Sequence, residues 1–222
     1  MLVGHLAVGF AAKRVEPRVS LGTLVMATMV ADFLWTIFTF AGVEHVEFRS
    51  GVMGAANYVV VRDISFSHSL LMDAIWAALV AAAYLARRHD PRRSWLLFGA
   101  VLSHWPLDVV AHPADMPLAP GVSTQLGLGL WTSVPATLVV EGGLWVVAIV
   151  LYARATQART RIGVLGFWMG AAVLTLIWYN NIAGPPPPNP RTAPIASFVF
   201  FSLTVAWAYW MNGLRPSQSR SL

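Results

Sequence analysis

Three side chains that can bind a metal ion follow one another at four-residue spacing near the middle of the chain. They are His104, Asp108 and His112, in the segment SHWPLDVVAH that covers residues 103–112. Because an α-helix has about 3.6 residues per turn, this spacing places the three side chains on one helical face. Two imidazoles and a carboxylate in that arrangement can bind a single cation. Pro106 has no backbone N–H and predicts a kink where this polar face begins.

The rest of the chain is too apolar for a soluble domain. Of its 222 residues 57% are hydrophobic and 11% are charged, whereas soluble domains are about 25% charged. Six apolar runs approach the roughly 20 residues that a helix needs to cross a bilayer. They cover residues 21–41, 66–85, 95–112, 135–153, 162–179 and 194–212, and a shorter run covers residues 1–12.

These runs predict an all-α, polytopic integral-membrane bundle of six spans with a short N-terminal membrane-embedded helix. We expect a single transmembrane domain over residues 1–222, in which residues 1–153 form the half with the metal site and the helices of residues 162–213 are scaffold. Two outer connections are long. The first, residues 42–65, contains the apolar stretch 52–61 and predicts an interfacial helix or flap, and the second, residues 113–134, predicts a lid or binding loop.

Basic residues are concentrated in every second connection between the predicted spans. The four groups are Lys13, Arg14 and Arg18; Arg87, Arg88, Arg92 and Arg93; Arg154, Arg159 and Arg161; and Arg215 and Arg220. The positive-inside rule therefore predicts a cytoplasmic C-terminus. The pI of about 10.2 then reflects topology, and we do not expect nucleic-acid binding. The chain has no cysteine, which excludes disulfides and thiolate ligands.

The predicted spans contain four carboxylates and no Lys or Arg. The carboxylates are Asp32, Asp73, Asp108 and Glu141. An ionised carboxylate in a bilayer needs a partner, which here must be a proton, water or a bound cation. The histidines His5, His68, His104 and His112 are good neutral ligands. Mixed imidazole and carboxylate ligands suit Zn²⁺, Mn²⁺ or Fe²⁺, and the number of ligands suffices for one or two ions. The alternative is a polar network that only joins helices.

The order of these residues resembles a known family. A histidine soon after Met1, an aspartate in the next apolar segment, a Ser-His-Ser element and a His-x-x-x-Asp element are similar to the bacterial membrane-bound metal-dependent hydrolases associated with the SOS (LexA) regulon. The resemblance covers about residues 1–112, and its matching positions are His5, Asp32, His68, His104 and Asp108. That family is distantly similar to zinc-dependent phospholipase C, a helical enzyme with clustered zinc ions. The resemblance implies a hydrolase of the bacterial inner membrane whose metal is bound by these five residues.

We therefore expect a membrane-embedded metal-dependent hydrolase in which the metal lowers the pKa of a bound water. Asp108 is the expected bridging ligand, and His112 or Glu141 completes a ligand set or acts as general acid or base. A site near the outer leaflet favours a membrane lipid or lipid-linked phosphoester as substrate. The alternatives are a metal or proton transporter that uses the same cluster, and a membrane scaffold or assembly factor with a structural metal.

Overall fold

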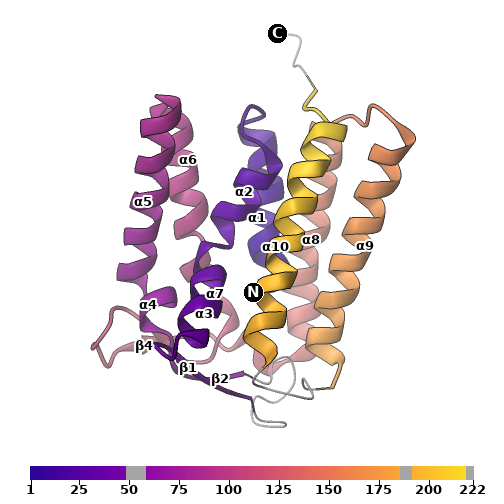
Figure 1. Cartoon of the computed structure of the whole chain (residues 1–222). Coiled ribbons are helices and arrows are strands. Elements are labelled where there is room, and N and C mark those ends of the chain that lie inside the picture. Colours follow the sequence, from indigo (N-terminus) through magenta and orange to yellow (C-terminus); the bar gives the residue numbers. More distant parts are fainter. Residues whose placement is uncertain (49–58, 186–191, 219–222) are drawn as a thin grey trace.

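The computed structural model describes residues 1–48, 59–185 and 192–218, and these residues are predominantly helical. Figure 1 shows long helices that lie side by side and run roughly along one direction. The helices longer than ten residues are α1 (Leu2–Val15), α3 (Val30–Phe40), α5 (Leu70–Arg88), α6 (Pro91–Leu102), α8 (Val134–Ala155), α9 (Arg161–Ala183) and α10 (Ala193–Leu214). The short helices are α2 (Leu21–Thr28), α4 (Ser65–His68), α7 (His104–Ala111) and the 3-10 turn η1 (Leu130–Thr132).

Several of these helices have the length and composition of membrane spans. The described residues include five such helices, one of which joins α6 and α7 as Pro91–Ala111. A sixth is obtained if α2 and α3, which meet at 54°, form one broken span. The predicted helical class and the compatibility with a multi-pass membrane protein are therefore confirmed.

Five of the helices begin at a residue whose side chain accepts a hydrogen bond from the first turn. This N-cap satisfies a backbone N–H that has no partner within the helix. The capping residues are Ser20 of α2, Ser69 of α5, Asp90 of α6, Ser133 of α8 and Thr160 of α9. Because these caps supply a protein acceptor for the first-turn N–H groups, they remain favourable at low dielectric.

Three predicted spans are each divided into two helices. The first breaks at Met29, the second at Ser69 and the third at Ser103. The last break follows from Pro106, because proline cannot donate to the carbonyl four residues earlier, that of Leu102, and its ring clashes with it. Each break lies close in sequence to one of the predicted metal ligands.

Helix α1 is enclosed by the bundle. It packs mainly against α8 and α2, and its side chains Val3, Leu6 and Phe10 are fully buried. With 14 residues it is about 21 Å long, shorter than a full span. This arrangement places the first turn of α1 in the interior, beside α7 (Figure 1).

Two short antiparallel strand pairs lie at one end of the bundle (Figure 1). The first pairs β1 (His45–Phe48) with β2 (Val59–Asp63), and the second pairs β3 (Met116–Pro117) with β4 (Gln125–Leu126). Of the connection predicted as an interfacial helix or flap, residues 45–48 and 59–63 form strands and not a helix, and residues 49–58 lie outside the described residues.

Candidate metal centre

The five residues predicted as metal ligands converge in the interior of the bundle. His5 comes from α1, Asp32 from α3, His68 from α4, and His104 and Asp108 from α7. The structure contains two triplets whose potential ligand atoms lie within 4.8 Å of one another: His5, Asp32 and His104, and His68, His104 and Asp108. These buried groups could hold a metal ion. Asp32, with its side chain 18% exposed, is the most accessible member.

A backbone carbonyl fixes which nitrogen of His104 carries the proton. Its Nδ1 lies 2.9 Å from the carbonyl oxygen of Thr28. A carbonyl can only accept, so Nδ1 carries the proton and Nε2 presents a lone pair. The Thr28 carbonyl is available because α2 ends at this residue and the last carbonyls of a helix have no partner within it. The break at Met29 thus prepares His104 as a ligand.

A relay of two side chains fixes which nitrogen of His68 carries the proton. Its Nδ1 lies 2.7 Å from the Ser67 hydroxyl, which lies 2.7 Å from Oε2 of Glu44. The other oxygen, Oε1, accepts the backbone N–H groups of Ser67 at 2.7 Å and Phe66 at 3.0 Å. Since a carboxylate only accepts, the Ser67 hydroxyl donates to Glu44 and accepts from the Nδ1–H of His68. Nε2 of His68 then also presents a lone pair.

Glu44 is buried just outside the spanning helices, between α3 and β1. Burial raises the pKa of its carboxyl group, and the hydrogen bonds from Ser67 oppose that rise. Its carboxylate holds the first turn of α4 and the Ser67 hydroxyl at once. Glu44 therefore positions His68 without belonging to the cluster itself.

The two free nitrogens point into one shared space. Nε2 of His68 and Nε2 of His104 lie 3.3 Å apart, and Oδ2 of Asp108 lies 3.1 Å from the latter. Oδ1 of Asp32 lies 3.8 Å from His68 Nε2 and 3.9 Å from His104 Nε2. Two lone pairs and two carboxylates facing one point repel one another unless a positive charge lies between them. This donor set could hold a metal ion.

His5 lies on the other side of Asp108. Its Nε2 is 3.0 Å from Asp108 Oδ1 and 2.9 Å from the amine of Met1, and the same amine lies 2.5 Å from Asp108 Oδ1. The ring stacks on His104 at 3.6 Å between centroids. Its Nδ1 is buried and, within the described residues, has no hydrogen-bond partner. The two oxygens of Asp108 thus face different histidines, an arrangement that suits a bridging carboxylate.

The two residues predicted as general acid or base lie beside the cluster. Oε1 of Glu141, on α8, accepts the backbone N–H of Gly4 at 3.3 Å and so holds the first turn of α1. Nδ1 of His112 lies 3.0 Å from Asp115, and its ring lies 4.5 Å from that of Trp131. Within the described part of the chain, neither residue belongs to a ligand triplet. Their catalytic roles stay predictions.

The residues that orient the histidines were not predicted from the sequence. Thr28 acts through its backbone, and Glu44 lies 23 residues before Ser67, so no local pattern joins them. The Ser-His-Ser element was the only available signal. Asp73, the remaining carboxylate of the predicted spans, accepts the backbone N–H of Trp105 at 3.4 Å.

Comparison with known proteins identifies no relative: no family model, no curated protein and no solved structure matches the chain. The family resemblance of residues 1–112 therefore stays a prediction, and the functional argument rests on the geometry of the cluster.

Proposed function

We propose that the chain crosses the membrane six times, with α2 and α3 as one broken span. The basic connections would face the cytoplasm. In support, the connection between α5 and α6, the connection between α8 and α9 and the end of α10 lie at one end of the bundle, opposite the strand pairs (Figure 1). The metal cluster, formed around α3, α4 and α7, then lies in the half nearer the outer surface.

We propose further that this cluster is the centre of a metal-dependent hydrolase. The observation that carries the proposal is the 3.3 Å separation of the Nε2 atoms of His68 and His104, both of which face inward with their Nδ1 atoms engaged elsewhere. Imidazole and carboxylate ligands favour zinc, with manganese or iron as alternatives. The two triplets share His104, so one or two ions fit the donor set.

The proposed chemistry divides between the metal and the protein. A zinc ion held by these residues would lower the pKa of a bound water and polarise a phosphoryl oxygen. Thr28 and the Glu44–Ser67 pair keep both histidines in the tautomer that binds metal. Asp108 would be among the residues that hold the metal, and Glu141 or His112 would exchange a proton with the substrate.

The proposed substrate is a lipid or lipid-linked phosphoester. The cluster lies among apolar helices, and Asp32, its most exposed ligand, marks where a reacting group can approach. A headgroup held at this depth would bring its ester bond to the cluster while the acyl chains stay in the bilayer. The family resemblance of residues 1–112 points to the same class of reaction.

The experiment is a metal analysis joined to an activity screen. Protein purified without chelator is analysed for zinc, manganese and iron and assayed against phosphodiester and phosphomonoester lipids in mixed micelles. We expect bound metal and hydrolysis, both lost in His104→Ala and both kept in His45→Ala, an exposed histidine on β1. Bound metal without hydrolysis, but with metal flux into vesicles, would favour the transporter alternative.

A further inference from the structure

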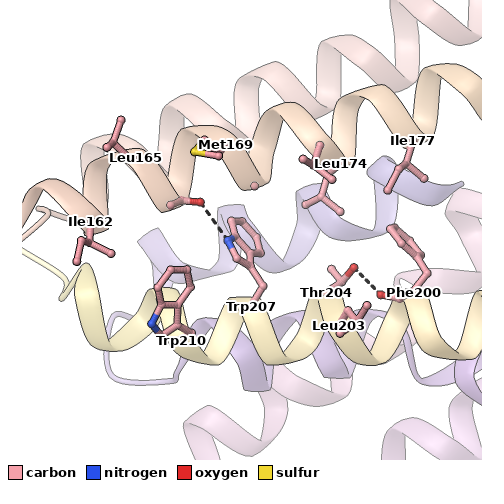
Figure 2. Close-up of a pocket in the computed structure, with 13 residues that line it drawn as sticks. Ile162, Leu165, Met169, Leu174, Ile177, Phe200, Leu203, Thr204, Trp207 and Trp210 are labelled. Carbon is pink, nitrogen blue, oxygen red and sulfur yellow. Dashed lines mark hydrogen bonds between the residues drawn. The ribbon is translucent and has the colours of Figure 1, made fainter.

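An apolar groove of about 570 Å³ runs between α9 and α10, on helices that the metal cluster does not use. Figure 2 shows its side chains lining the space between the two helices. Val173 of α9 and Leu203 of α10 are 52% and 64% exposed, so the groove opens away from the helical core. Its volume lies within the roughly 300–1,000 Å³ typical of small-molecule sites.

Two polar side chains of the groove are already engaged by the protein. The Thr204 hydroxyl donates to the Phe200 carbonyl at 2.8 Å, and the Trp207 indole N–H donates to the Gly166 carbonyl at 3.1 Å (Figure 2). Gly170 lets the Trp207 ring approach α9, since a Cβ atom there would lie 2.3 Å from it. Apart from the indole N–H of Trp210, the groove therefore offers a ligand apolar contact only.

The length of the groove suits one acyl chain. Along α9 it extends from Ile162 to Ile177, which corresponds to about 22 Å at roughly 1.5 Å per residue. One leaflet contributes about 15 Å, half of the roughly 30 Å hydrocarbon core. The groove is therefore longer than the hydrocarbon layer of one leaflet, so a single acyl chain can lie in it over the whole length of the chain.

Positive charge lies at one end of the groove. Arg159 and Arg161 immediately precede Ile162 and are exposed. The backbone N–H of Arg159 donates to the Leu214 carbonyl at 3.0 Å, which holds this arginine-bearing loop against the end of α10. The sequence contains no Asp or Glu after Glu141, so no acidic side chain of this half opposes an anion. Guanidinium groups bind phosphate by paired, charge-assisted hydrogen bonds.

We propose that this groove binds an anionic phospholipid, with one acyl chain between α9 and α10 and the phosphate beside Arg159 and Arg161. The inference goes beyond the proposed hydrolase, because it assigns a lipid-binding role to helices expected to be scaffold. It requires neither metal nor turnover, so it can fail or hold independently of the metal centre.

Native mass spectrometry tests the proposal with phosphatidylglycerol and phosphatidylcholine supplied in equal amounts in micelles. We expect one retained phosphatidylglycerol per chain and several-fold less phosphatidylcholine. Val173→Trp fills the groove and should remove the bound lipid, and Leu203→Trp repeats the test from α10 should the first variant not fold. Val164→Trp is the matched control, because Val164 lies on α9, is 42% exposed and does not line the groove.

The headgroup contact is tested by Arg159→Gln/Arg161→Gln, which should abolish the preference for phosphatidylglycerol. Arg92→Gln, an exposed arginine at the start of α6, should leave the preference unchanged. Equal retention of the two lipids by the unaltered protein would overturn the headgroup assignment. Unchanged lipid retention in both groove-filling variants would overturn the groove assignment. So would a protein that binds no lipid and forms a dimer that the groove-filling variants dissociate.

Discussion

Nε2 of His68 and Nε2 of His104 lie 3.3 Å apart, although the two rings come from α4 and α7 and are fixed by unrelated partners. Neither nitrogen can donate to the other while each Nδ1 holds its own proton. The pair is therefore stable only with a cation between the rings or with an added proton. Two carboxylates face the same space, which supports the proposed metal ion.

The first prediction concerns the relay to His68. In Glu44→Gln the side-chain oxygen keeps the two backbone N–H groups, so the amide N–H₂ faces Ser67 and donates to its hydroxyl. The Ser67 proton then turns to His68 Nδ1, and the lone pair on Nε2 is lost. We expect metal affinity to fall roughly 10- to 100-fold, measured by competition with a fluorescent zinc chelator.

Two variants serve as controls for that experiment. Ser67→Ala removes the relay but leaves His68 free to choose its tautomer, so it should weaken binding less than Glu44→Gln. Asp63→Asn changes a nearby exposed carboxylate that bonds only Ser65 among the described contacts and should have no effect. Equal affinity of Glu44→Gln and Asp63→Asn would show that the relay does not set the tautomer.

A second prediction concerns the core that holds α1. Phe10 is fully buried and contacts Trp145 and Tyr152 of α8, with ring centroids 5.1 and 5.2 Å away. Phe10→Ala should lower the free energy of unfolding by about 3–5 kcal/mol. Phe40→Ala, at the exposed end of α3, should change it by about 0.5 kcal/mol or less. Denaturant unfolding in detergent micelles measures both, and similar losses would contradict the central place of α1.

Metal removal gives a third prediction, with a defined dependence on pH. Histidine ligands must be deprotonated to bind metal, so protons compete with it as the pH falls below about 6.5. The stability supplied by metal is therefore present at neutral pH and lost on acidification. A chelator should lower the Tm at pH 7.5 and leave it unchanged near pH 5. The same Tm with and without chelator at pH 7.5, in protein verified to contain metal, would favour protonated acids instead.

The fourth prediction fixes the orientation in the membrane. The chain has no cysteine, so single cysteines can be labelled without background. Arg92→Cys, at the start of α6, should react only after the membrane is opened, whereas Ser123→Cys, between β3 and β4, should react from outside. Both positions are exposed. Reaction of position 92 in sealed cells would reverse the topology and with it the placement of the cluster near the outer surface.

The sequence predicted the helical class and the residues that gather at the cluster, because apolar run length and the absence of Lys and Arg from the spans are local properties. It could not predict how the histidines are oriented. That depends on a carbonyl freed at a helix break and on Glu44, which meets Ser67 only through the fold. The groove between α9 and α10 could not be predicted from the sequence either, since its walls are ordinary apolar residues whose spacing also suits scaffold helices.

The central claim is that His104 and its neighbours hold a metal ion, and metal content measures it most directly. Protein purified without chelator and equilibrated with zinc is analysed by mass spectrometry of the elements, alongside His104→Ala and His45→Ala. The account predicts one or two zinc ions per chain in the unaltered protein and in His45→Ala, and loss of bound zinc in His104→Ala, since both triplets contain His104. Folded protein that binds no zinc, manganese or iron, or the same zinc content in His104→Ala, would contradict it.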